Sequence, residues 1–140
     1  MNTPYILVVA PRFVRIVGRF TTGTNDAKGL AVFPFIFVSK REFVQDWLIT
    51  HELIHFRQAF ETFFIGLPIL SFFERLYARL VLKKNNMERY LYAASEQEAY
   101  LNMHNPEYLK TRRFGSLFYY VRHKRDFILT GPGELEFRDV

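Results

Sequence analysis

The residues best suited to chemistry in this chain are two histidines and a glutamate in the segment His51-Glu52-Leu53-Ile54-His55. On a helix, side chains four residues apart lie on the same face, one above the other. Two imidazoles placed in this way can bind one zinc ion through ring nitrogens at about 2.0–2.1 Å. Glu52 follows the first histidine and could take a proton from a zinc-activated water. The segment therefore predicts a Zn²⁺ site with His51 and His55 as ligands and Glu52 as general base.

The composition restricts the kind of metal site that the chain could build. It has no cysteine, which excludes disulfides, thiolate ligands and a cysteine nucleophile. Zinc must then be held by histidine and carboxylate, and three such ligands leave a fourth position open, as in catalytic sites. With 140 residues, of which 49% are hydrophobic, the chain is long enough for one domain with a real core.

A third ligand is expected from the segment Ser95-Glu96-Gln97-Glu98-Ala99-Tyr100, about forty residues after His55. It offers two carboxylates, Glu96 and Glu98. Both faces of a helix in this region are mixed in polarity, so periodicity does not choose between them. Asn102 lies four residues after Glu98 and could support it, whereas Tyr100 takes that place after Glu96.

With these two motifs, the chain resembles the gluzincin metallopeptidases, the thermolysin-like class. In that family a HExxH helix is joined by a glutamate from a later helix, often within Glu-x-x-Ala-Asp or Glu-x-x-Ala-Asn. The resemblance implies that Glu96 is the third ligand, with Glu98 as the alternative, and that Tyr100 stands where the family has Asp or Asn. The chain also resembles small uncharacterised bacterial HExxH proteins with a Phe-Pro-Phe strand and an ExEAY helix, which brings no activity with it.

The resemblance implies a zinc-dependent hydrolase, a metallopeptidase that cleaves peptide bonds with Glu52 as general base. A second donor usually stabilises the oxyanion in such sites. The candidates for this oxyanion or outer-shell role are Tyr100, His104 and Tyr108. Gln58, one turn after His55, could contact a ligand or merely cap the helix face, and the second interpretation is preferred.

The elements that must position these residues follow from local patterns. Runs of β-branched and aromatic residues predict strands over Tyr5–Ala10, Phe13–Thr21 and Gly29–Ser39. Pro34 cannot donate to a strand ladder, so the third strand is expected at a sheet edge or with a bulge.

Ser39, with Glu42 three residues on, predicts a capped helix over 40–60. Further helices are expected over 67–82, with a bend at Gly66 and Pro68, and over 87–103, and a turn at 131–134.

The expected fold class is therefore α+β, a minimal zincin-like fold. A small twisted antiparallel or mixed sheet at the N-terminus would pack on the active-site helix, which further helices follow. The chain is expected to form one domain, 1–140, with a β-rich part (1–39), a helical part with the metal site (40–110) and a basic, aromatic extension (111–140). In zincin folds the edge strand before the helix lines the cleft and pairs with an extended substrate, and residues 29–39 occupy that place.

Charge and apolar runs bear on partners other than a peptide or protein substrate. The net charge is +5, and basic residues gather late in the chain: Lys110, Arg112, Arg113, Arg122, His123, Lys124 and Arg125. Such a surface could face anionic lipid, although a solvated basic face is the more common explanation. No nucleic-acid motif accompanies it.

The apolar run 63–73 is too short to span a bilayer, which takes about 20 residues. A buried helix or hairpin is favoured there, with interfacial insertion as the alternative. The N-terminus lacks the pattern of a signal peptide, so a cytoplasmic protein is expected, with peripheral membrane association left open.

Two other hypotheses compete with the peptidase. The first is a zincin-fold protein that binds the metal without turnover. The second is a basic peripheral membrane or interaction module in which the HExxH motif is coincidental. Zinc content separates the second from the other two, and comparison of turnover before and after Glu52→Gln separates the first.

Overall fold

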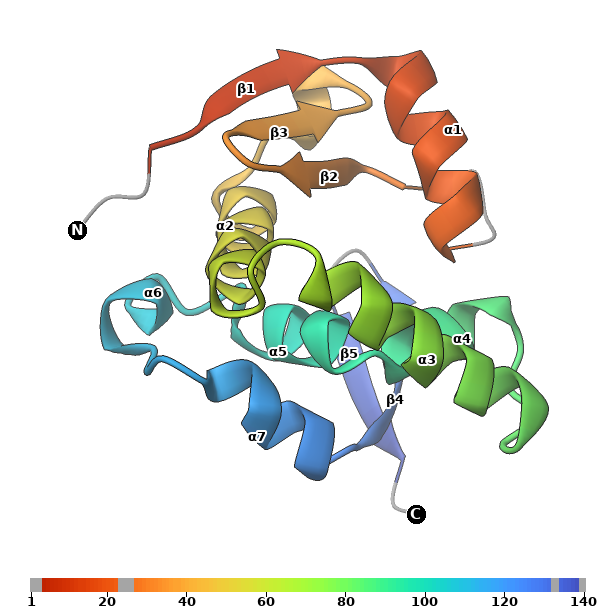
Figure 1. The fold of residues 1–140 in the computed structure, drawn as a ribbon. Coiled ribbons are helices and arrows are strands. Elements are labelled where there is room, and N and C mark those ends of the chain that lie inside the picture. Colours follow the sequence, from red (N-terminus) through yellow and green to blue (C-terminus); the bar gives the residue numbers. More distant parts are fainter. Residues whose placement is uncertain (1–3, 23–26, 132–133, 139–140) are drawn as a thin grey trace.

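A computed structural model of the chain describes residues 4–22, 27–131 and 134–138. In these residues the fold is α+β, with a three-stranded mixed sheet, seven α-helices and a C-terminal two-stranded ribbon. Figure 1 shows the sheet and helix α1 at one end of the molecule and helices α3 to α7 at the other. Helix α2 connects the two layers. This arrangement agrees with the expected α+β class, with a small N-terminal sheet followed by helices.

The N-terminal sheet contains β1 (Ile6–Val9), β2 (Gly29–Val32) and β3 (Phe35–Val38) in the order β1-β3-β2. β1 pairs with β3 in parallel, with Leu7 opposite Ile36. β2 pairs with β3 antiparallel, with Gly29 opposite Val38. β2 therefore lies at one edge of the sheet, and among the described residues β3 is its one strand neighbour.

The predicted strand over Phe13–Thr21 is wrong, because these residues belong to helix α1 (Pro11–Thr22). Proline at the first helical position has a backbone angle already suited to a helix. Val14 and Gly18, four residues apart, are both buried, so the apolar residues follow a helical period. The β-branched composition of the segment pointed to a strand, and packing of α1 against β2 and β3 overrides it.

The predicted single strand over Gly29–Ser39 is two strands. The chain turns at Phe33 and Pro34, whose peptide bond is cis, and β3 returns along β2. Pro34 thus lies in the turn and outside both ladders, as the missing N–H requires. The cleft-lining edge strand is the first of the two, β2.

The helix that carries His51 and His55 begins later than the capping pattern predicts. Residues Arg41–Phe43 form a short 3-10 turn (η1), and helix α2 spans Asp46–Glu61 with Gln45 at its N-cap. Ser39 hydrogen bonds instead to the carbonyl of Lys28 through its hydroxyl, at 3.4 Å. The capping box that was expected between Ser39 and Glu42 is therefore not the start of α2.

The helices after α2 are shorter than expected. Helix α3 spans Gly66–Leu80, and the region predicted as one helix divides into α4 (Asn86–Tyr92) and α5 (Ala94–Asn102). The division lies at Ala93, whose backbone is extended. Both carboxylate oxygens of Glu74 on α3 accept from the backbone N–H of Ala94, at 3.3 and 3.1 Å. A buried carboxylate from another helix thus caps the start of α5.

The C-terminal part contains α6 (Tyr108–Thr111), α7 (Ser116–Arg122), β4 (Asp126–Gly131) and β5 (Glu134–Arg138). β4 and β5 pair antiparallel, so the segment expected as a turn and a polar end is a β-ribbon. The middle of that expected turn, residues 132–133, lies outside the described residues.

The core that holds α2 on the sheet is made of Ile36 and Val38 from β3 and Leu48 and Phe56 from α2, all almost fully buried. This contact aligns helix α2 with edge strand β2, against which it packs. The other side of α2 packs on α5. Within the described part of the chain, no helix is both long and apolar enough to cross a membrane.

Candidate metal centre

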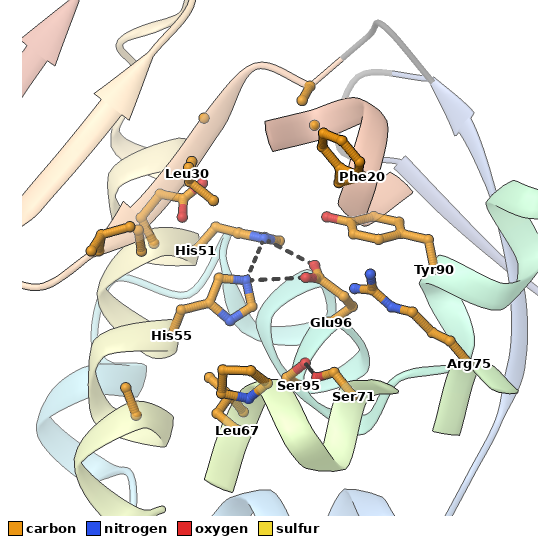
Figure 2. Close-up of a pocket in the computed structure, with 18 of the residues that line it drawn as sticks. Phe20, Leu30, His51, His55, Leu67, Ser71, Arg75, Tyr90, Ser95 and Glu96 are labelled. Atoms are coloured by element: carbon orange, nitrogen blue, oxygen red, sulfur yellow. Dashed lines mark hydrogen bonds and ion pairs between the residues drawn. The ribbon is translucent and has the colours of Figure 1, made fainter. Parts of the chain in front are cut away.

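Three side chains from two helices converge at the centre of the molecule. His51 and His55 come from the middle of α2, and Glu96 comes from the first turn of α5. Nε2 of His51 lies 3.1 Å from Nε2 of His55 and 3.4 Å from Oε2 of Glu96. Nε2 of His55 lies 3.5 Å from Oε1 of Glu96. Figure 2 shows the three side chains pointing toward one another.

These separations suit a metal ion held between the three side chains. Ligand atoms about 2.0–2.1 Å from a tetrahedral zinc lie about 3.4 Å from one another. The three distances of 3.1, 3.4 and 3.5 Å are close to this value. The group His51, His55 and Glu96 could therefore hold a metal ion.

A buried polar atom is a second reason to expect a metal ion between these three side chains. Oε2 of Glu96 is buried and accepts no hydrogen bond from the described residues. A buried carboxylate oxygen that accepts no hydrogen bond costs about 1–3 kcal/mol or more. Two imidazole nitrogens that face each other at 3.1 Å also require a shared proton or a cation between them. A metal ion would satisfy all three atoms at once.

The hydrogen bonds of Gln58 determine which nitrogen of His55 faces the site. The amide nitrogen of Gln58 donates to the carbonyl of Ser95 at 3.0 Å and to Oε2 of Glu98 at 2.9 Å. Its oxygen must then be the atom that faces Nδ1 of His55, at 2.8 Å. Nδ1 therefore carries the hydrogen, and in the neutral ring Nε2 presents its lone pair to the metal position.

Glu98 lies outside the metal cluster. It is fully buried, and Gln58, Tyr108 and Arg112 all donate to its oxygens. Arg112 also donates two hydrogen bonds to Glu61 at the end of α2. Glu98, the alternative third ligand, is thus part of an ion-pair network with Arg112. Through Gln58 this network supports helix α2, on the side away from the candidate metal position.

Glu52 is buried beside the cluster, next to the first strand residue of β2. A side chain at Gly29 would place its Cβ 2.7 Å from Oε1 of Glu52. Glycine at this position therefore leaves the space that the carboxylate occupies. Burial raises the pKa of Glu52, the two histidines lower it, and Glu96 raises it, for a net increase. A more basic carboxylate is better suited to accept a proton near neutral pH.

The titration of the ligands is coupled in the metal-free protein. Burial lowers the pKa of His55, but the carboxylate of Glu96 raises it, to about 9 on balance. Burial alone would raise the pKa of Glu96, but the two imidazoles lower it well below its ordinary value. The carboxylate is thus ionised, and a cation is favoured between it and the imidazoles.

The three candidates for an oxyanion or outer-shell role lie in different places. The ring of Tyr100 packs edge-on against the ring of His51, with centroids 4.6 Å apart, and lines the pocket. Tyr108 donates to Glu98 at 2.8 Å, away from the three ligands. His104 is exposed, and its ring lies 6.2 Å from that of Trp47. Only Tyr100 of the three lines the pocket.

Two further residues, Tyr90 and Arg75, line the pocket beside Glu96, and no sequence pattern predicted either of them. Figure 2 shows the hydroxyl of Tyr90 and the guanidinium of Arg75 directed toward Glu96. Arg75 also lies over the ring of Tyr90, 5.3 Å from its centroid. Burial raises the pKa of Tyr90, and the neighbouring carboxylate of Glu96 raises it further, so the phenol keeps its proton. Both residues come from helices whose packing no local pattern reveals.

The metal cluster forms part of the wall of a pocket of about 1120 Å³. Edge strand β2 and the end of α1 line one side of the pocket, and α3 and α4 line the other. Its lining is mainly apolar, with cations at Lys28, Arg75, Arg79 and Arg89. A volume of this size suits several residues of a peptide or a drug-sized ligand.

The late basic residues do not form one free surface. Arg112 is buried against Glu61 and Glu98, and Lys124 donates to Glu74 and to the carbonyl of Tyr92. Two of these seven basic residues, Arg112 and Lys124, thus hold buried carboxylates in place.

Comparisons with models of protein families, with curated proteins and with solved structures gave no match to this chain.

Proposed function

We propose that this protein is a zinc-dependent metallopeptidase of the gluzincin type. The observation that carries the proposal is the position of a buried carboxylate, Glu52, beside two histidines and a glutamate that could hold a metal, on the wall of a large pocket. Each part has a role in hydrolysis: a Lewis acid, a proton acceptor, and space for a substrate.

A zinc ion held by His51, His55 and Glu96 would lower the pKa of a water molecule and polarise the substrate carbonyl. Glu52 is the residue that would accept one proton from the attacking water as the water oxygen bonds to the carbonyl carbon. Glu52 then passes the proton to the leaving nitrogen as the C–N bond breaks. Gln58 holds the His55 ring in the orientation that this geometry needs.

Neutral phenols are available to the negative charge that develops on the carbonyl oxygen. Burial raises the pKa of Tyr100, and the charge of Glu96 raises it too, so the hydroxyl remains a donor. Tyr90, with its raised pKa, offers a second such hydroxyl in the same pocket. Donors directed at a developing oxyanion contribute several kcal/mol to catalysis, typically about 3 kcal/mol each.

Edge strand β2 supports a peptide as the substrate. All four of its residues line the pocket, and its one described strand neighbour is β3. The other edge of a strand offers backbone N–H and C=O groups to an extended peptide. A peptide laid along β2 would pass next to Glu52, because Gly29 brings the strand close to that carboxylate.

The test has two measurements on purified protein. Zinc content should be one ion per chain, and a quenched-fluorescence peptide library should be cleaved. Glu52→Gln should keep the zinc and abolish cleavage, while His51→Ala and His55→Ala should lose the zinc. Glu42→Gln and His104→Ala, at exposed positions outside the pocket, serve as matched controls and should change neither.

Two results would contradict the proposal in different ways. Zinc at full occupancy without any cleavage would favour a metal-binding protein without turnover. A protein that binds no zinc at micromolar free metal would exclude a zinc enzyme altogether.

A further inference from the structure

The outer side of helix α3 and the loop before it expose large apolar side chains. We call this surface the α3 face. Its members, with their exposed fractions, are Phe63 (87%), Ile65 (72%), Ile69 (51%), Phe72 (61%), Phe73 (61%), Leu80 (56%) and Val81 (59%). On α3 they follow a helical stripe, while Glu74 and Ala78 face inward. A contiguous apolar surface on this scale marks a binding site more often than chance exposure does.

The loop that leads into α3 holds its aromatic residues in an unfavourable backbone conformation. Phe63 and Phe64 have φ values of 52° and 62°, a region that favours glycine. Each of these two residues strains the backbone. The exposed ring of Phe63 gains little inside the chain to offset this cost, since 87% of the residue is accessible.

The exposed charged residues near the α3 face, between residues 60 and 83, are all cations. Glu61 and Glu74, its two carboxylates, are buried and paired with Arg112 and Lys124. Arg79 and Lys83 are exposed. From Phe60 to Lys83, all of which the structure describes, the exposed charges are therefore positive.

We propose that the α3 face docks on an anionic phospholipid bilayer. An apolar stripe flanked by cations lies in the interface of such a membrane, with its apolar side chains among the acyl chains. Each cation near the surface strengthens binding to anionic lipid. A second copy of this chain suits the face less well, because a two-fold contact brings the same cations together without carboxylates to pair with them.

The α3 face is continuous with the pocket. Phe64, Leu67, Pro68 and Phe72 line the pocket next to this face. Docking would then place the pocket opening at the lipid surface, and a substrate would be a peptide segment held at the interface. That last consequence rests on the proposed peptidase function, whereas the docking itself does not.

The experiment is sedimentation of the full chain with vesicles of phosphatidylcholine alone or with 30 mol% phosphatidylglycerol. Binding is expected to the anionic vesicles only, and to weaken as salt is raised. The triple variant Phe63→Ser/Ile65→Ser/Phe73→Ser, at exposed positions of the α3 face that do not line the pocket, should bind at least tenfold more weakly. Lys83→Glu, at an exposed position outside the pocket, should also bind measurably more weakly.

Each variant has a matched control elsewhere in the structure. Ile6→Ser/Val9→Ser/Ile16→Ser changes three exposed apolar residues of β1 and α1, in the other layer of the molecule. Arg113→Glu makes the same change of net charge as Lys83→Glu, at an exposed position outside the α3 face. Both controls should bind like the wild type.

Three results would overturn the proposal: no binding of the wild type to anionic vesicles, equal loss in the matched controls, or self-association that the triple variant abolishes without any vesicle binding. Zinc content and peptide cleavage in solution, measured on the same variants, report separately on the proposed enzyme. Loss of vesicle binding with zinc and cleavage intact would therefore test the docking alone.

Discussion

Gln58 and His55 lie one turn apart on α2 and are joined by a hydrogen bond of 2.8 Å between Oε1 and Nδ1. The amide of Gln58 is held in turn by Ser95 and Glu98, both on α5, the helix that carries Glu96. One fully buried side chain therefore links both ligand helices and orients one of the ligands.

Replacing Gln58 should weaken metal binding without removing a ligand. In Gln58→Met the ring of His55 loses the acceptor that fixes its tautomer, and we expect zinc affinity to fall about 10–100-fold. Competition with a chromophoric chelator measures the affinity, and circular dichroism checks the fold. Gln97→Met is the matched control, because Gln97 is equally buried but bonds to Leu91 and Arg125. Equal zinc affinity in wild type and Gln58→Met would contradict the role assigned to Gln58.

Gly29→Ala should separate turnover from metal binding. The new Cβ would lie 2.7 Å from Oε1 of Glu52, so the carboxylate must move. Since Oε1 is the end of a flexible side chain, we expect a small change in stability but a loss of cleavage of tenfold or more. Gly66→Ala is the control, because its new Cβ would contact Thr62, which lies outside the site. The Gly66→Ala protein should cleave peptides normally. Full activity in Gly29→Ala would exclude Glu52, in its present position, as the base.

Zinc affinity should rise with pH between about 6.5 and 9. The pKa of His55 in the metal-free protein is raised to about 9, so binding below this value releases a proton. One proton released corresponds to a tenfold change in affinity per pH unit. The same raised pKa stabilises the metal-free fold fully below about pH 6.5, and this stabilisation is lost as the pH rises toward 9. Chelator competition and urea unfolding at pH 6.5, 7.5 and 8.5 test both trends, and a flat affinity would contradict the assignment.

The parts of the site that depend on local spacing could be predicted from the sequence. The four-residue separation of His51 and His55 fixes their common face on any helix, and the structure brings Glu96 to them as the family resemblance implied. The role of Gln58 could not be predicted, because its partner Glu98 lies forty residues away.

In the fold, too, the elements that the sequence did not predict depend on contacts between residues far apart in the chain. Helix α1 has the β-branched composition of a strand, and its helical form depends on packing against β2 and β3. The break between α4 and α5 likewise depends on Glu74, a distant carboxylate that caps Ala94.

The ion-pair network behind the site should be essential for stability. In Arg112→Met the carboxylates of Glu61 and Glu98, whose side chains are 2% and 0% exposed, would remain buried without their cation. Breaking a buried pair in this way costs about 3–5 kcal/mol, so we expect a large loss in the free energy of unfolding in urea. Lys110→Met is the matched control, since Lys110 and its partner Glu107 are 65% and 63% exposed. Such an exposed pair contributes less than about 1 kcal/mol. A similar small effect in both variants would mean that water reaches the network. It would also mean that Arg112 does not hold the Glu98 carboxylate in position to accept from Gln58.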